Sequence, residues 1–370
     1  MNLKRVILWV VLLAVAAPTM ARESRTRTKY PSFEWGIRAG LTGIYNDNPL
    51  RLSETDENAF HRYASSFRTP LETTDDGESE LSLQPSLQWR APGNLMVNAN
   101  YKVKFVNRLR NDFTDYQTHG LAVSARPRMK GYRWNAKAAW FLIPSYYLRV
   151  YRDRDLGYYA DAKFRNWEYS AEFSYRILDP LWIGVKGASG TYYYNSTFTE
   201  FDSEYQEAGV TSTYLFPKSV SLTGGYLRRA SENVGKDQAL HTVISPEGSD
   251  LVSDNEFGNG DFDEDEFSAS LRAPLKFFRQ LSLRGSLSGK MRRRVYTSNE
   301  TLTDDPFHRG RLDTRWEVTP DVQWAVSSLL DVNLYFTYEQ RSSESDNPSV
   351  ALVKNFVRRE FGVGVAYALK

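Results

Sequence analysis

Eight basic side chains occupy polar positions in segments where polar and apolar residues alternate. At one predicted level of the interior, next to the short turns, they outnumber the acids, which are Glu34, Asp321 and Asp331. A cluster of cations in a low-dielectric constriction concentrates and selects anions. Alternatively, these cations pair with interior acids and only fill the interior, and the sequence leaves both interpretations open. The eight predicted anion-binding residues are Arg90, Arg126, Arg128, Arg133, Arg176, Lys186, Arg272 and Arg284.

An acidic run at residues 261–266 contains side chains that can ligate a metal ion. The candidate ligands are Asp261, Asp263 and Asp265, with Gly260 available for a turn. Carboxylates are the hard oxygen ligands that Ca²⁺ prefers. The spacing does not fit an EF-hand loop, so a solvated acidic loop is the favoured interpretation and no metal site is predicted.

The sequence offers little for catalysis. Its 4 histidines are His61, His119, His241 and His308, and their spacing to serines and carboxylates does not form a recognisable triad. The absence of cysteine excludes disulfides and thiolate chemistry. We find no phosphate-binding loop and no nucleic-acid-binding module. The expectation is a protein that is not an enzyme, uses no cofactor and binds no nucleic acid.

The basic residues must be positioned by β-strands, which are predicted where apolar and polar residues alternate with a period of two. Residues 80–91 place Leu81 and Trp89 on an apolar face, a turn follows at 91–94, and alternation resumes over 95–105. This pattern predicts an antiparallel hairpin. A soluble β-sandwich buries such an apolar face, whereas a membrane barrel turns it toward lipid and keeps the polar face inside.

The N-terminus predicts the compartment. Lys4 and Arg5 precede an apolar run over residues 6–17, and small residues lead to a cleavage site near Ala21. A single membrane anchor is the alternative, but the run is shorter than the ~20 residues that a spanning helix needs. No other run is long enough, so a membrane role requires a barrel. The predicted organisation is a signal peptide at 1–21, a short periplasmic segment at 22–32 and a single transmembrane barrel domain at 33–370.

Long polar loops alternate with short turns through most of the chain, as in bacterial barrels. Keeping all long loops on one side requires residues 146–152 to form a strand. The prediction is an all-β, antiparallel up-and-down transmembrane β-barrel of about 16 strands, with about 14 or 18 as alternatives. A soluble sandwich is less favoured, because charged residues recur along one face of nearly every segment and Trp or Tyr lies near the segment ends.

Two stretches resemble known families. The C-terminal residues Glu360, Gly362, Val365 and Tyr367 resemble the insertion signal of bacterial outer-membrane barrels, although this chain closes on Leu369 and Lys370 where the family has Phe or Trp. Residues 45–52, Tyr-Asn-Asp-Asn-Pro-Leu-Arg-Leu, look like a stretch found in large barrels from exopolysaccharide gene clusters.

These resemblances and the basic residues together suggest a function. The expectation is a porin-like channel in the outer membrane of a Gram-negative bacterium that passes an anionic saccharide or exopolysaccharide, in the manner of alginate-type export porins. Its expected partners are outer-membrane lipids, the barrel assembly machinery and periplasmic export proteins. The alternative is a barrel occluded by its own loops that serves as a structural or assembly partner of a secretion complex, since residues 46–79 and 230–265 are long enough to fold inward.

Overall fold

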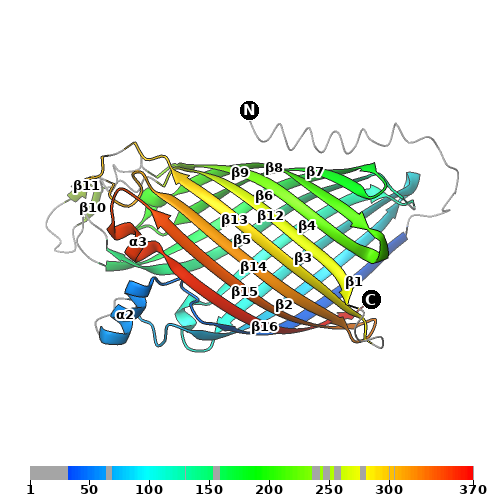
Figure 1. The fold of residues 1–370 in the computed structure, drawn as a ribbon, viewed down its shortest axis with the longest axis horizontal. Helices are drawn as coiled ribbons and strands as arrows, with labels where there is room; N and C mark the ends of the chain where they lie inside the picture. Colours follow the sequence, from blue (N-terminus) through cyan, green and yellow to red (C-terminus); the bar gives the residue numbers. More distant parts are fainter. Residues whose placement is uncertain are drawn as a thin grey trace.

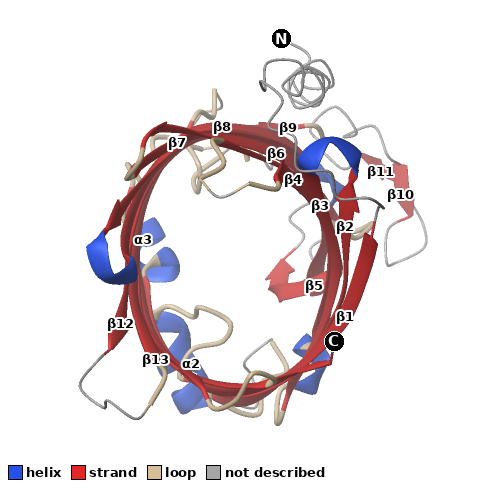
Figure 2. Cartoon of the chain, turned by 90° about the vertical axis from the view of Figure 1, so that its right-hand side faces the viewer, coloured by secondary structure: helices blue, strands red, loops and turns tan. Residues whose placement is uncertain are grey.

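In a computed structural model, fourteen antiparallel strands close into one barrel, seen from the side in Figure 1 and along its axis in Figure 2. The first strand closes the ring on the last, from Ile37 opposite Leu369 to Asn46 opposite Glu360. The described residues are 32–63, 69–129, 131–152, 159–235, 242–244, 251–253, 260–275, 281–299, 301–303 and 305–369. The predicted signal peptide, its cleavage site at Ala21 and residues 22–31 lie outside them.

Each barrel strand pairs with its neighbours in the chain, which makes the topology up-and-down. The strands are β1 (Ser32–Asn46), β2 (Asp76–Ala91), β3 (Leu95–Arg108), β4 (Tyr116–Pro127), β5 (Trp134–Arg152), β6 (Tyr159–Leu178), β7 (Leu181–Tyr194), β8 (Ser203–Phe216), β9 (Val220–Asn233), β12 (Phe262–Leu275), β13 (Leu283–Tyr296), β14 (Leu312–Ala325), β15 (Leu330–Glu344) and β16 (Phe356–Leu369).

The short connections lie together at one end of the barrel, which we call the turn end, and the long ones lie at the loop end (Figure 1). The turn end includes the helical turns η3 (Pro92–Asn94) and η6 (Pro217–Ser219), the start of β1 and the end of β16. The loop end includes α2 (Glu54–Tyr63), η4 (Asp112–Thr114), η5 (Thr199–Phe201), α3 (Ser349–Lys354) and a separate sheet of β10 (Thr242–Ile244) and β11 (Leu251–Ser253).

The prediction of about 16 strands is wrong by two, and β5 accounts for one of them. The pattern predicts a break at Pro144, whereas β5 runs without a turn from Trp134 to Arg152. Its pairing with β6 shifts register between Ile143 and Tyr146 and again shortly afterwards. A bulge inserts an extra residue and changes which face the following side chains occupy. The interrupted alternation therefore imitates a strand end.

The second miscounted strand is β6. The alternation predicts two strands here, joined by a tight connection at Arg165 and Asn166, whereas β6 runs through both residues. Trp167 and Tyr169 are apolar residues on the outer face, but nearer the loop end the apolar residues, such as Phe164, lie on the inner face. The Phe164 ring packs 5.3 Å from the ring of Tyr146. The apolar face switches because this part of β6 has left the outer apolar band. Each error counted one continuous strand as two. Because the two errors together change the strand number by an even number, the long loops still share one end.

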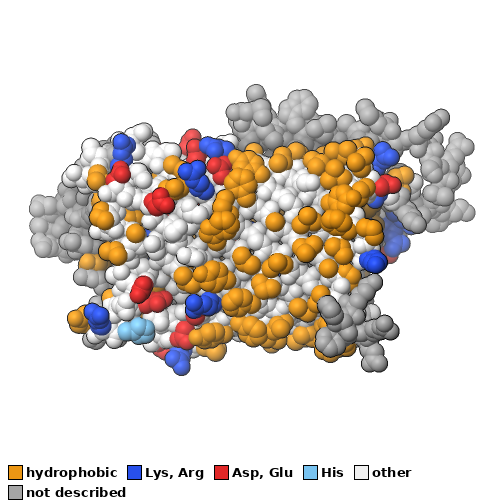
Figure 3. Space-filling model, viewed as in Figure 1, with side chains coloured by type: hydrophobic (Ala, Val, Ile, Leu, Met, Phe, Trp, Pro, Cys, Tyr) orange, Lys and Arg blue, Asp and Glu red, His pale blue; other side chains and the backbone are white. Residues whose placement is uncertain are grey.

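Large apolar side chains cover the outside of the barrel over the half next to the turn end (Figure 3). Trp35 is 67% exposed and Leu41 is 58% exposed, and charged side chains replace such residues toward the loop end. Exposed apolar surface of this extent marks contact with a partner or a membrane. A closed barrel satisfies its backbone hydrogen bonds internally and can therefore span lipid. The architecture is that of a porin-like outer-membrane barrel.

No helix among the described residues is long and apolar enough to cross a membrane.

The C-terminal strand contains a close approach that depends on glycine. Glu360 and Gly362 face the interior, and Val365 and Tyr367 face outward, where they are 46% and 44% exposed. The ring of Tyr335 on β15 lies against Gly362, where an added Cβ would overlap the Cε1 atom of that ring. The Tyr335 hydroxyl donates to Glu360 at 2.9 Å, which holds the ring in place.

We expect Gly362→Ala to destabilise the barrel by about 1–3 kcal/mol, because the Tyr335 ring must move to admit the methyl group. Urea unfolding of the protein in detergent micelles measures the effect. Gly43→Ala is the matched control, since a Cβ at Gly43 meets nothing within 4 Å. In a Tyr335→Ala background the cost of Gly362→Ala should largely vanish. An equal cost in both backgrounds would contradict this explanation.

Candidate functional site

The structure places the eight predicted basic residues in the turn-end half of the barrel. Six of them lie on strands β2, β4, β6, β7, β12 and β13, at positions that alternate with outward apolar residues. Arg128 and Arg133 lie in the β4–β5 connection at the turn end. Lys186 is deeper than the prediction placed it, level with Glu172 and Gly209 on the neighbouring strands. The closed barrel brings the other residues to one mouth.

Some of these cations have acidic partners. Arg90 forms an ion pair with Glu34, and Lys186 lies 3.4 Å from the carboxylate of Glu207. Arg176 lies 3.9 Å from Asp179, whose side chain is 96% exposed, so water weakens this attraction. These residues fit the alternative interpretation, in which the cations pair with acids and fill the interior.

Five of the predicted cations have no ion pair within the described part of the chain: Arg126, Arg128, Arg133, Arg272 and Arg284. The acids at this level are fewer than the cations, and Asp321 attracts Arg272 without forming an ion pair with it. Asp331 pairs with Arg38 at 2.7 Å, and Asp321 accepts a hydrogen bond from Ser286 at 3.4 Å. The mouth therefore presents an excess of positive charge to its interior.

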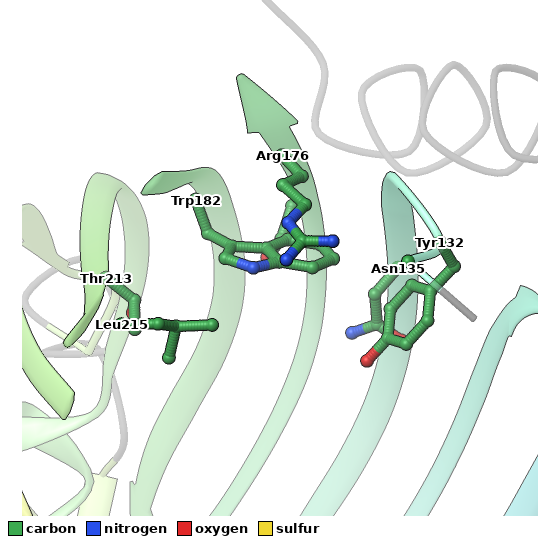
Figure 4. A pocket seen from close by; sticks show the side chains of 8 residues that line it. Tyr132, Asn135, Arg176, Trp182, Thr213 and Leu215 are labelled. Atoms are coloured by element: carbon green, nitrogen blue, oxygen red, sulfur yellow. The ribbon is translucent and has the colours of Figure 1, made fainter. Parts of the chain in front are cut away.

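A cavity of about 480 Å³ opens at this mouth, and Figure 4 shows its lining. It is built from four adjacent strands and the turn before β5. Neighbouring inward positions contribute the side chains of Asn135, Arg176, Trp182 and Thr213. Tyr132 completes the wall and lies 5.3 Å from Trp182, measured between ring centroids.

Trp182 and Tyr132 were not among the predicted site residues. A signal for Trp182 was present, because it alternates with the outward residues Leu181 and Ile183 and must therefore face inward beside Arg176. A tryptophan at an inward position departs from the polar pattern of a barrel interior. Tyr132 precedes its strand, so its contact with Trp182 depends on the tertiary structure.

The loop-end half of the interior contains buried ion pairs. The carboxylate of Glu339 is fully buried and lies 2.5 Å from Arg315, 2.8 Å from Arg358 and 3.2 Å from Arg51. Glu264 lies 2.8 Å from Arg294. Such pairs replace hydration lost on burial, and removal of one partner leaves an uncompensated charge.

The stretch at residues 45–52, which resembles a motif of exopolysaccharide barrels, folds into the loop end. Asn48 fixes its turn, because its side-chain amide donates to the Leu52 carbonyl at 2.8 Å and its side-chain oxygen accepts from the Leu52 backbone amide at 2.6 Å. The Asn48 amide also donates to the Val357 carbonyl on β16 at 3.1 Å. Leu50 and Leu52 are buried against Tyr147 on β5.

Residues 47–53, which we call the inward segment, therefore connect two separated parts of the wall. Tyr147 belongs to β5, whereas Glu339, the partner of Arg51, belongs to β15, and these strands are not neighbours. Burial disfavours the charged form of Arg51, but the charge of Glu339, the hydrogen bond to it and the nearby Tyr146 together outweigh burial and raise the pKa of Arg51 above its usual value. The inward segment narrows the loop end.

Helix α3 adds a second contact across the loop end. The ammonium group of Lys354 lies 5.9 Å from the ring of Tyr151 on β5 and 5.8 Å from that of Phe307. Burial, together with the charges of Arg311 and Arg149, holds the pKa of Lys354 well below its usual range. The loop end is thus occupied by cationic and aromatic side chains from several connections.

The acidic run at residues 261–266 is not the solvated loop that the sequence predicts, because β12 begins at Phe262. Consecutive acids point to opposite faces. Asp263 lies 2.8 Å and Asp265 3.3 Å from Arg228 on the outside, and Glu264 pairs with Arg294 on the inside. Within the described ranges, no three His, Asp or Glu side chains are grouped as metal ligands.

The histidines lie apart from one another. His119 on β4 contacts the Tyr101 hydroxyl at 2.6 Å, and His308 contacts the Asp305 carboxylate at 2.9 Å in the β13–β14 connection. His61 lies on α2. His241 is outside the described residues.

No family model and no curated protein matches the chain. Solved structures similar to it include a bacterial polysaccharide outer membrane secretin, with 8% identity and TM-score 0.40 over 90% of this chain and 98% of the other. OprD of Pseudomonas aeruginosa has 10% identity and TM-score 0.38 over 91% and 95%. OccAB3 of Acinetobacter baumannii has 9% identity and TM-score 0.41 over 91% and 100%. At these identities the similarity concerns the barrel fold alone.

Proposed function

We propose that this porin-like barrel is an outer-membrane channel that takes an anionic saccharide, such as an exopolysaccharide chain, from the periplasm through its turn end and passes it outward. The turn end is assigned to the periplasm because bacterial barrels place short turns there and long loops outside. We assign the barrel no catalytic role. Lipids, the assembly machinery and periplasmic export proteins are its proposed partners.

The observation that supports this proposal is the set of mouth arginines without acidic partners. A guanidinium group binds carboxylates and phosphates through two parallel hydrogen bonds. Arginines such as Arg126 and Arg284 lie on the inner wall of the barrel near its opening, and the low-dielectric protein around the opening focuses the field of their charges into it. A polyanion approaching the turn end therefore meets an attractive field before it contacts any single residue.

Charge reversal tests this role. We expect the combined substitutions Arg126→Glu, Arg128→Glu and Arg133→Glu to change reconstituted channels from anion-selective to cation-selective, because they replace three mouth cations with three anions. The reversal potential in a salt gradient across a planar bilayer measures selectivity.

The matched control reverses three exposed charges near the loop end, with Arg62→Glu, Arg110→Glu and Arg165→Glu. These positions lie outside the mouth, so the reversal potential should change little. Both sets should also be measured with Arg51→Ala, so that the narrowed loop end does not hide the current. Unchanged selectivity of the mouth variant would contradict the proposed function.

The inward segment favours a second candidate function, in which the barrel is closed by its own loops and acts as a structural or assembly partner of a secretion complex. Leu50 and Leu52 pack against Tyr147 as an internal contact, which is unusual for a freely open pore. Absence of ion current from a variant lacking the inward segment would favour this second role over transport.

A further inference from the structure

Two arginines flank a pair of aromatic rings along the turn-end cavity. The Arg126 guanidinium lies 4.9 Å from the Tyr132 ring centroid, Tyr132 is next to Trp182, and the Arg176 guanidinium lies 5.8 Å from Trp182. Figure 4 shows Arg176 lying across the Trp182 ring, with Tyr132 and Asn135 on the facing side. Cation–π contacts position these groups without neutralising their charge.

Both guanidinium groups retain capacity for a ligand. Arg176 donates from Nε to the Asp179 backbone carbonyl at 2.9 Å, which orients the side chain and leaves its terminal nitrogens directed to the cavity. Among the described residues, Arg126 contacts only the Met96 sulfur at 3.7 Å besides the Tyr132 ring. Arg126 therefore has no ion pair among the described residues, and the carboxylate near Arg176 is that of the exposed Asp179 at 3.9 Å, which competes only weakly with an incoming anion.

The remaining lining provides neutral polar groups. The Asn135 side chain has no hydrogen-bond partner within the described chain, and Thr213 shares its hydroxyl with Thr223 at 3.0 Å. An amide both donates and accepts hydrogen bonds, as recognition of sugar hydroxyls requires. The volume of about 480 Å³ falls within the range of ~300–1,000 Å³ that is usual for small-molecule sites.

We propose that this cavity, defined by Tyr132, Asn135, Arg176 and Trp182, with Arg126 beside it, is a binding subsite for one carboxylated sugar unit at the periplasmic entrance. The apolar face of the sugar ring packs against the aromatic pair, its carboxylate binds the guanidinium groups, and its hydroxyls bind Asn135. The inference rests on the proposed function, because the cavity lies inside the proposed channel.

Calorimetric titration of the full-length protein in detergent micelles with an oligogalacturonate tests the subsite. We expect Trp182→Ala and Arg176→Ala each to weaken binding by roughly tenfold or more, since each removes one of the two contact types. Maltohexaose, which has no carboxylate, should bind much more weakly than the oligogalacturonate and should be insensitive to Arg176→Ala.

Two control variants separate the subsite from general electrostatics. Arg165→Ala removes the same charge from an exposed position outside the mouth, and Trp324→Ala removes an outward-facing tryptophan, so each should change affinity less than twofold. Equal losses for Arg176→Ala and Arg165→Ala, unchanged affinity of Trp182→Ala, or no binding by the unmodified protein would each overturn the subsite. If the subsite fails these tests but Trp182→Ala channels remain anion-selective, the proposed function stands without the subsite.

Discussion

Replacing residues 47–75 with an Asn-Gly turn is expected to raise the single-channel conductance of the barrel several-fold. Asn46 and Asp76 are paired neighbours in the β1–β2 ladder, so a two-residue turn can join these strands without disturbing the barrel. The replacement removes the inward segment together with α2. The interior at the loop end is then bounded by the wall and the remaining connections.

A smaller change should release the inward segment without deleting it. Arg51→Ala removes its ion pair with Glu339, and the Glu339 carboxylate still has Arg315 at 2.5 Å and Arg358 at 2.8 Å. The release of Arg51 therefore leaves no unpaired buried carboxylate. We expect conductance between those of the unmodified barrel and the deletion variant.

Single-channel recording in planar bilayers measures both variants. Arg62→Ala on α2 is the control, since this side chain is exposed and should leave conductance unchanged. If the deletion variant folds, as judged by heat-modifiable electrophoretic mobility, and conducts no better than the unmodified protein, the inward segment does not limit the pore.

Substitution of Glu339 has the largest expected effect on stability. Glu339→Ala leaves the charges of Arg51, Arg315 and Arg358 without their shared counter-ion in the interior. Breaking a buried ion pair by removing one partner costs about 3–5 kcal/mol. We expect a loss of this size in the free energy of unfolding, measured by urea titration in micelles with far-ultraviolet circular dichroism.

Glu317 provides a matched control on the adjacent strand. It also faces the interior and lies opposite Glu339 in the β14–β15 register, but it is partly exposed and lies 3.9 Å from Arg315. Glu317→Ala should therefore cost less than ~1 kcal/mol. Glu339→Gln, which keeps the volume and removes the charge, should resemble Glu339→Ala. Similar losses at Glu339 and Glu317 would show that the shared counter-ion is not important.

The barrel class could be predicted from the sequence because strand alternation is a local property. Leu81 and Trp89 face one way and the polar residues between them face the other, whichever strands pair with them. The number of strands was harder to predict from the sequence than the barrel class. The register shift near Pro144 and the change of apolar face between Phe164 and Trp167 both imitate strand ends, and the pairing partners were needed to recognise continuous strands.

The inward positions of Arg126 and Arg176 likewise follow from local alternation, and their placement near the turns follows from the positions of those turns. The absence of an ion pair at Arg126 among the described residues does not follow from alternation, because an ion pair between strands depends on which strands become neighbours and in what register. Arg90 meets Glu34 only because β1 pairs with β2 in one register.

An antiparallel barrel with an apolar outside, a polar inside and long connections at one end could be predicted from the chain, since each of these features follows from the period of alternation and the lengths of the connections. The entry of residues 47–53 into the loop end and the contact of Tyr132 with Trp182 became visible only in the folded barrel. The inward segment touches strands on separated parts of the wall, which barrel closure brings within its reach, and Tyr132 precedes its strand, where alternation assigns no face.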